Sequence, residues 1–184
     1  MKSFEIKESG ISDLKVIKKT KISDDRGFLS RFFCFNELEE AGWKKPIAQI
    51  NQTLTIKKGT IRGMHFQKNL SKEMKFVSCL NGAVYDVAID IRRGSTTFLK
   101  HFATELSEEN NYSLLIPEGF AHGFQALTDD VELLYLHSNF YSSEDEDGLN
   151  PLDKRLNINW PLEKLFISSK DNNRRLIDSK YQGI

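Results

Sequence analysis

Two apolar runs on either side of the dipeptide Asn81-Gly82 constrain the fold of this chain more than any other feature. The first run is Lys75–Leu80 and the second is Ala83–Ile91. An Asn-Gly pair favours the positive backbone angles of a type I′ turn, which joins two antiparallel strands. The sequence therefore predicts a β-hairpin in this region.

Strand patterns extend along most of the chain, and many of them are bounded by Gly, Asp, Asn or Pro. The further predicted strands are Leu14–Lys19, Phe28–Phe35, Ile47–Ile56, Thr60–Gln67, Phe98–Glu105, Tyr112–Ile116, Gly123–Ala126 and Val131–Asn139. Short strands at this spacing favour an all-β sandwich or barrel.

Helical patterns are confined to two short segments. One helix is predicted over Glu37–Ala41, with Asn36 as its N-cap and Gly42 as its stop. A second helical segment is predicted near Asp171–Ser179. The acidic stretch Glu144–Asp147 predicts an exposed loop.

The length and charge of the chain narrow the class of protein. Its 184 residues predict a single domain, residues 1–184, which is large enough to bury a core without disulfides or a structural metal. The 26 basic and 26 acidic residues give a net charge of zero, so no overall field favours nucleic acid or an anionic membrane. Any anionic ligand must therefore be bound by local cations.

The two cysteines and the apolar runs indicate a location. Cys34 and Cys79 form no spacing motif, which favours free thiols in a reducing compartment. The first residues lack the apolar core of a signal peptide, and no apolar run approaches the length of a membrane span. We therefore expect a soluble, cytoplasmic protein.

Two segments place a histidine among apolar residues of predicted β structure, namely Arg62–Gln67 and Pro117–Phe124. Two such sites in one small domain suggest a shared pocket. The Pro-x-Gly-x-x-His form of Pro117–His122 resembles jelly-roll domains of the cupin superfamily, in which this histidine points into the barrel. Many cupins bind a metal through His-x-His, and His65-Phe66-Gln67 lacks the second histidine, so we expect no metal.

Further motifs make the resemblance specific. From about Asp24 to Asp171 the chain resembles the dTDP-4-dehydrorhamnose 3,5-epimerase family of nucleotide-sugar enzymes. The matching segments, in order and spacing, are Arg62–Gln67, Gly82–Arg92, Leu106–Asn110, Ile116–Phe124 and Asn157–Pro161. The resemblance implies an all-β cupin jelly roll (a double-stranded β-helix) with short peripheral helices. It also implies a homodimer that inverts carbons beside the ketone of a nucleotide-linked 4-keto-6-deoxyhexose.

Epimerisation beside a ketone needs a base, an acid on the opposite face and a group that holds the enolate oxygen, but no redox or metal cofactor. The resemblance implies that His65 is the base, Asp171 its carboxylate partner, Tyr135 the acid and Lys75 the cation near the oxygen, with His122 in the same pocket. Without the resemblance, the two histidines and the tyrosine would be core residues, Lys75 solvated and Asp171 a helix cap.

Nucleotide binding needs cations for the diphosphate and flat surfaces for the base. By resemblance, Arg62 and Arg26 bind the diphosphate, with Lys170 as a further candidate, and Phe140 stacks on the base. Phe28 matches a turn that in this family reaches into the neighbouring subunit's site, so the resemblance implies shared active sites in the dimer. The remaining expected substrate-binding residues are Gln49, Asn51 and His122. His101 and His137 match nothing in the family, and we expect them at the surface or rim.

Two departures leave the substrate open. The glutamate that the family carries near Ser30 or Arg31 is missing, so the nucleotide need not be dTDP. The segment Gly148–Asp153 lacks a tryptophan often present there, and Gln49–Gln52 has a slightly different spacing to His65. The alternatives are a single-centre 3- or 5-epimerase, a 3,4-ketoisomerase on another nucleotide sugar, and a non-catalytic cupin that only binds a sugar nucleotide.

Overall fold

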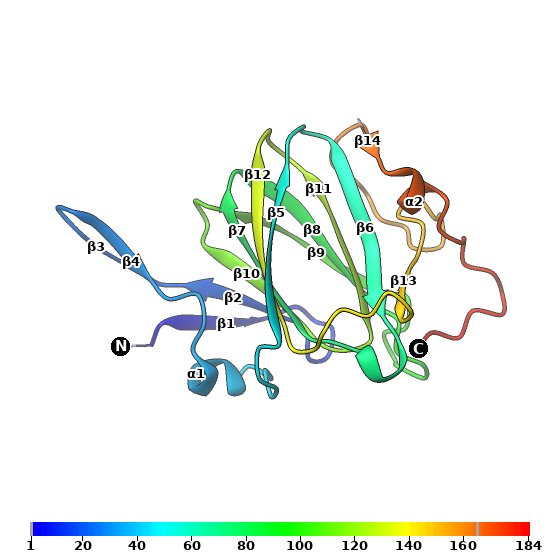
Figure 1. Cartoon of the computed structure of the whole chain (residues 1–184), viewed down its shortest axis with the longest axis horizontal. Helices are drawn as coiled ribbons and strands as arrows, with labels where there is room; N and C mark the ends of the chain where they lie inside the picture. The colour runs from blue at the N-terminus through cyan, green and yellow to red at the C-terminus, as the bar shows by residue number, and fades with distance from the viewer. Residues whose placement is uncertain (1, 165) are drawn as a thin grey trace.

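The computed structural model describes residues 2–164 and 166–184. Two large antiparallel sheets pack face to face, and a small two-stranded sheet projects from them (Figure 1). The first sheet has the strand order β1 (Phe4–Glu8), β2 (Lys15–Lys19), β10 (Tyr112–Ile116), β7 (Lys75–Asn81), β12 (Val131–His137) and β5 (Gln49–Thr55). The second has the order β13 (Glu146–Gly148), β6 (Thr60–Gln67), β11 (Phe120–Ala126), β8 (Ala83–Asp90) and β9 (His101–Ser107), and β14 (Phe166–Ile167) also pairs with β6.

The remaining elements are peripheral and short. They are the strands β3 (Lys21–Asp24) and β4 (Gly27–Ser30), the helices α1 (Phe35–Glu39) and α2 (Ser169–Asn172), and the 3₁₀ turn η1 (Asn69–Ser71). The jelly-roll fold class with short peripheral helices is therefore confirmed. No helix among the described residues is long and apolar enough to cross a membrane.

Three apolar clusters explain why the strands read as nearly continuous apolar runs. Consecutive residues on a strand face opposite ways, so Val77 joins the cluster between the two sheets while Phe76 joins a second cluster on the outer face. Trp43 and Leu38, from the α1 segment, cover that outer face. The C-terminal segment covers the outer face of the second sheet, with Ile177 among its buried residues. Each fully buried large side chain contributes about 1.5–3 kcal/mol.

The predicted hairpin at Asn81-Gly82 is wrong, although both of its strands exist. β7 pairs with β10 and β12, whereas β8 pairs with β9 and β11, so the chain crosses from one sheet to the other here. Only Gly82, with φ of 74°, adopts the positive backbone angle that a type I′ turn requires at both positions. Residues of both strands, Val77 and Val84 among them, pack in the apolar cluster between the two sheets.

Most of the other predicted strands are confirmed, with ends shifted by a few residues. Thr60–Gln67 and Tyr112–Ile116 coincide with β6 and β10. The prediction of Phe28–Phe35 is wrong beyond Ser30, since β4 ends there and α1 begins at Phe35.

Both predicted helices differ in detail. Cys34, and not Asn36, is the N-cap of α1. The tail helix is only the four residues of α2, and Ser168 caps it by accepting the backbone N–H of Asp171. The acidic stretch is not simply an exposed loop either, because Glu146 lies in β13 and forms an ion pair with Arg174 at 3.2 Å.

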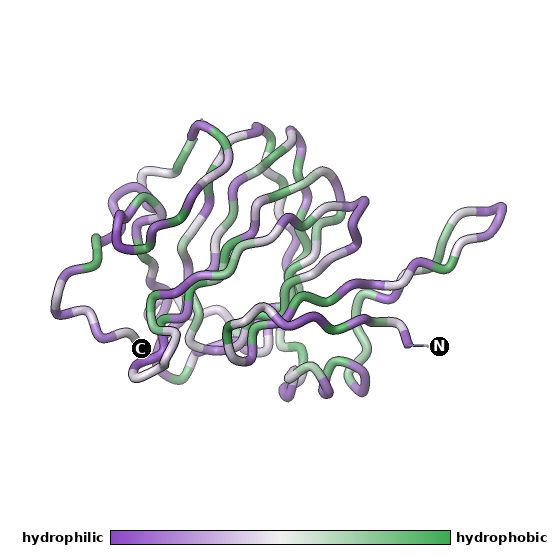
Figure 2. Tube along the Cα trace, turned by 180° about the vertical axis from the view of Figure 1, so that it is seen from behind, coloured by the Kyte–Doolittle hydropathy of each residue, from purple (hydrophilic) through white to green (hydrophobic). Residues whose placement is uncertain are grey.

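The hairpin of β3 and β4 extends away from the two large sheets (Figure 1). Figure 2 shows apolar stretches along its strands and a hydrophilic tip. Ile22, Phe28 and Leu29 are 57%, 63% and 71% exposed on it. An arm with this much exposed apolar surface is typical of a segment that packs against another molecule.

Candidate active site

Two glycines bring the histidines of β6 and β11 together. His65 and His122 are register partners on these antiparallel strands, and a bulge follows between His122 and Phe124. A Cβ atom on Gly63 would lie 2.5 Å from the Cα atom of Gly123, so only glycine permits this approach of the two backbones. The two imidazoles therefore lie on neighbouring strands and face the same cavity.

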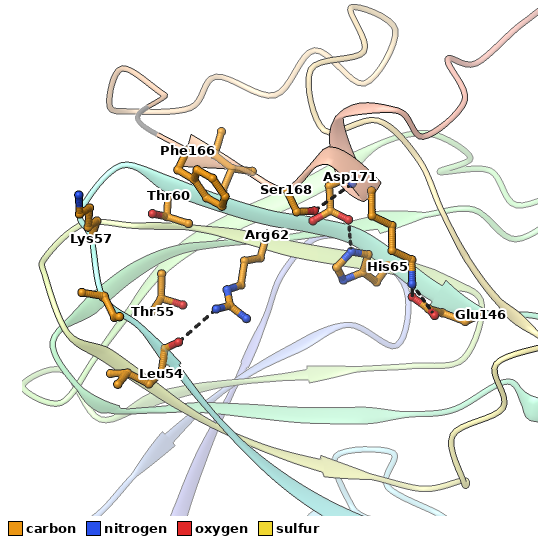
Figure 3. A pocket seen from close by; sticks show the side chains of 13 residues that line it. Leu54, Thr55, Lys57, Thr60, Arg62, His65, Glu146, Phe166, Ser168 and Asp171 are labelled. Carbon is orange, nitrogen blue, oxygen red and sulfur yellow. Dashed lines mark hydrogen bonds and ion pairs between the residues drawn. The ribbon is translucent and has the colours of Figure 1, made fainter.

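His65 and Asp171 form an imidazole–carboxylate pair. His65 Nε2 lies 2.7 Å from Asp171 Oδ1, and the carboxylate is buried on α2 behind the ring (Figure 3). Burial raises the pKa of Asp171, but hydrogen bonds from His65, Gly63 and Ser168 outweigh it and hold the pKa below its ordinary value. The ionised carboxylate accepts a hydrogen bond from Nε2–H, which leaves Nδ1 of the neutral ring as a base.

Tyr135 lies on the opposite sheet and contacts His122 edge to face, with ring centroids 6.0 Å apart. Burial, and then the charge of Asp86, raises the pKa of Tyr135 well above its ordinary value. The phenol therefore keeps its proton at neutral pH. His122 Nε2 lies 2.9 Å from both carboxylate oxygens of Asp86, which is fully buried.

Asp86 is a site residue that the sequence interpretation missed. The sequence signal for it was a carboxylate within the apolar strand Ala83–Ile91, because a charged side chain is buried in such a strand only when it has a partner.

Lys75 and His137 share a second buried carboxylate. Lys75 Nζ lies 3.5 Å from the carbonyl oxygen of His65 and 3.4 Å from Glu73 Oε1. His137 Nδ1 lies 2.8 Å from Glu73 Oε2. The expectation that His137 is a surface or rim residue is wrong, since it is 8% exposed and lies on the inward face of β12 with Tyr135. The period of two along β12 was the signal that could have placed it.

Two adjoining cavities make up the candidate site. The inner cavity has a volume of about 210 Å³, and its walls include Asn51, His65, Lys75, His122, Tyr135 and His137. The outer cavity has a volume of about 740 Å³, and its walls include Leu54, Ile56, Glu146, Phe166, Lys170 and Asp171 (Figure 3). Arg62 and His65 line both.

The expected substrate-binding residues differ in position. Arg62 lies at the junction of the cavities and donates to the carbonyl oxygen of Leu54 at 3.1 Å (Figure 3). Lys170 is in the outer cavity, but its ammonium is bonded to Glu146 at 2.7 Å. Gln49 accepts the backbone N–H of Tyr141 through Oε1 at 2.9 Å, beside Phe140.

Phe140 is 69% exposed, but neither it nor Gln49 lines either cavity. Arg26 and Phe28 line neither cavity of their own chain. They lie on the projecting hairpin, where Arg26 pairs with Asp24. Among the described residues, no three His, Cys, Asp or Glu side chains gather in a group that could hold a metal ion.

A jelly roll with a histidine on one sheet, paired with a carboxylate of a short helix, and a buried phenol on the other sheet defines an acid–base enzyme of the cupin type. The family model for dTDP-4-dehydrorhamnose 3,5-epimerase matches residues 8–179, and the chain belongs to this family. It is an isomerase, an epimerase of nucleotide-linked 4-keto-6-deoxy sugars.

The proteins similar to this chain include 3,5-epimerases and a 3′-monoepimerase. The dTDP-4-dehydrorhamnose 3,5-epimerase of Shigella flexneri is 41% identical over 173 residues, which cover 93% of this chain and 95% of that protein. The structure of RmlC from Legionella pneumophila in complex with dTDP-4-keto-L-rhamnose has a TM-score of 0.91 at 37% identity, covering 98% of this chain and 97% of that one. ChmJ, a 3′-monoepimerase from Streptomyces bikiniensis in complex with dTDP-quinovose, has a TM-score of 0.84 at 32% identity, covering 90% and 84%.

Proposed function

We propose that this protein inverts both C3 and C5 of a dTDP-linked 4-keto-6-deoxyhexose, with His65 as the base and Tyr135 as the acid. The observation that carries the proposal is the placement of these two groups on opposite sheets around one cavity. A base on one side of the sugar ring and a proton donor on the other are what inversion of a carbon requires.

In the proposed reaction His65 Nδ1 removes the proton from a carbon beside the ketone. The electron pair of the broken C–H bond forms the enolate, whose oxygen carries the negative charge. Asp171, 2.7 Å from Nε2, stabilises the imidazolium that results. Tyr135 then donates its proton to the opposite face of the carbon, and solvent exchange resets both groups. A positioned acid or base contributes roughly 10²–10⁴-fold to the rate.

Lys75 is the proposed cation for the enolate oxygen. Its side chain is only 12% exposed, so its charge is little screened by water. A preorganised donor of this kind contributes roughly 10²–10³-fold. His122, fixed by Asp86, is proposed to hold Tyr135 and the sugar in place.

The nucleotide is proposed to occupy the outer cavity, with its diphosphate near Arg62 and Lys170. Its base is proposed to stack on the exposed ring of Phe140, which lies outside the walls of both cavities. The support for dTDP comes from relatives, since structures of the family were obtained with dTDP or dTDP sugars. Gln49 and Asn51, on the adjacent edge strand β5, are proposed to bind the same ligand.

A homodimer with shared active sites is part of the proposal. Arg26 and Phe28 lie on an exposed apolar arm and reach no cavity of their own chain, so a partner's site is the natural place for them. Such an arm contributes residues reciprocally in a two-fold dimer. A cytoplasmic location stays a prediction, supported by the free thiols of Cys34 and Cys79.

The test is proton NMR of dTDP-4-keto-6-deoxyglucose with the pure protein in D₂O, following the C3 and C5 proton signals. Loss of both signals with formation of the rhamno product is the expected result. Loss of one signal would identify a single-centre enzyme, and migration of the ketone to C3 a ketoisomerase. A protein that binds the nucleotide sugar without any exchange would refute the proposal.

A further inference from the structure

His137 and Glu73 have no part in the reaction described above, yet His137 faces its inner cavity and Glu73 is bonded to it. His137 follows Tyr135 by two positions on β12, so both side chains lie on the same face. Their rings are stacked, with centroids 6.0 Å apart and planes inclined by 16°. Glu73 lies behind His137, and its side chain is 8% exposed. The pair repeats the arrangement of His65 and Asp171 on the opposite wall.

The carboxylate fixes which nitrogen of His137 faces the cavity. Burial raises the pKa of Glu73, but the hydrogen bond from His137 and the nearby Lys75 outweigh it and hold the pKa below its ordinary value. The ionised carboxylate therefore accepts a hydrogen bond from Nδ1–H of His137, with 2.8 Å between the two heavy atoms. In the neutral ring Nε2 is left as an acceptor.

Among the described residues, one protein donor lies within hydrogen-bond distance of His137 Nε2, and that contact is long. Asn51 Nδ2 lies 3.4 Å from His137 Nε2, at the long end of the hydrogen-bond range. A better placed donor could therefore bind to Nε2. The other polar groups around the inner cavity include the donors Lys75, Arg62 and Tyr135 and the imidazoles of His65 and His122. His65 Nδ1 is the proposed base, whereas His137 Nε2 is an acceptor that the proposed reaction does not use.

We propose that His137 is a specificity-determining residue that accepts a hydrogen bond from a ring hydroxyl of the sugar, and that Glu73 positions it. A ketone oxygen can only accept, so it suits Lys75, whereas a hydroxyl needs an acceptor as well. In a nucleotide-linked 4-keto-6-deoxyhexose only C2 and C3 carry hydroxyls. The inference rests on the proposed function, because it takes the inner cavity as the place of the sugar.

The test compares three substrates of the enzyme: the 4-keto-6-deoxyhexose linked to dTDP and its 2-deoxy and 3-deoxy analogues. Exchange of the C5 proton in D₂O can be measured for all three. We expect the wild-type kcat/KM to be about tenfold or more lower for one analogue, because the acceptor then loses its hydroxyl partner. Equal kcat/KM values for the three substrates would overturn the proposal without any variant.

Variants separate the contribution of His137 Nε2 from that of its ring, which stacks on Tyr135. His137→Phe keeps a ring to stack on Tyr135 but lacks Nε2, so the ratio between substrates should fall to about one. Glu73→Gln still offers an oxygen to Nδ1 and should keep most of the ratio, whereas Glu73→Ala should lose part of it. His101→Phe, on β9 and outside both cavities, is the matched control and should leave the ratio unchanged.

The failures of the two proposals are distinguishable. Wild-type exchange combined with an unchanged substrate ratio in a folded His137→Phe variant would overturn the role of His137 alone. Absence of exchange with every substrate would refute the proposed function. The ratio of the Kd values of the hydroxylated and deoxy nucleotide sugars, measured by calorimetry, would then test the same contact.

Discussion

Replacing Asp171 by asparagine exchanges one carboxylate oxygen for an amide nitrogen and removes the negative charge beside His65, with little change in shape. The carboxylate accepts a hydrogen bond from Nε2–H of His65, with 2.7 Å between the heavy atoms. Because the carboxylate side chain is 5% exposed, this charge-assisted hydrogen bond is shielded from water. An amide can instead donate to Nε2, which would place the proton of His65 on Nδ1 and block the base. The imidazolium would also lose its counter-charge. Loss of an oriented, charge-stabilised base predicts a fall in kcat of about 10²–10⁴-fold.

Stability should change far less than activity. The backbone N–H of Asp171 remains bonded to Ser168 at 3.0 Å, and the amide oxygen of asparagine can still accept the N–H of Gly63. We expect the loss in free energy of unfolding to stay within about 1–3 kcal/mol, the range for a hydrogen bond to a charged group.

The assay is C3 and C5 proton exchange in D₂O at saturating substrate, together with thermal unfolding. Asp178→Asn, an exposed aspartate on the same C-terminal segment, is the matched control and should keep wild-type exchange. A folded Asp171→Asn variant with kcat within threefold of wild type would refute the pairing argument.

Three other outcomes are expected. Tyr135→Phe should reduce inversion about 10²–10⁴-fold while leaving the Kd for dTDP unchanged, since a phenol that stays protonated is lost; inversion at the wild-type rate would exclude it as the acid. The folded-state pKa values of Asp171 and Glu73 are lowered, so both carboxylates stabilise the fold at any pH above their unfolded pKa, which is near 4. This stability is lost as the pH falls through the folded-state pKa, so Tm should fall below about pH 4, and less steeply in Asp171→Asn. Leu29→Asp on the 71% exposed arm should yield monomers in light scattering and a lower kcat/KM, and a fully active monomer would contradict shared sites.

Local patterning predicted the strands of the two large sheets in most cases, because burial imposes the same residue types wherever a strand lies. It missed four peripheral or edge strands, namely β1, β3, β13 and β14. β6 and β10 coincide with the predicted segments, and most other strand ends moved by a few residues. The arm was harder to place, because its apolar residues have no partner in the same chain and β4 ends at Ser30. α1 begins at Phe35 without a side-chain cap, so no sequence signal marked its start.

The site depended on information of another kind. His65 and Asp171 are 106 positions apart, and only the resemblance to a family, not any local pattern, joined them. Asp86 and His137 carried local signals, a carboxylate within an apolar strand and the period of two along β12, but these signals named no partner. Glu73 carried none. Their role became visible only when their partners were known.

By itself the sequence determined an all-β chain, the approximate extent of most of its strands and, through ordered motifs, the epimerase family. Only the tertiary structure decided that the strands beside Asn81-Gly82 belong to different sheets and that Glu73 pairs with His137. The physical reason is that hydrophobic burial acts on each residue by its type, whereas strand pairing and the pairing of charges depend on residues distant in the chain. When both faces of a strand are buried, alternation no longer marks the inward side, and only packing against the second sheet can select it.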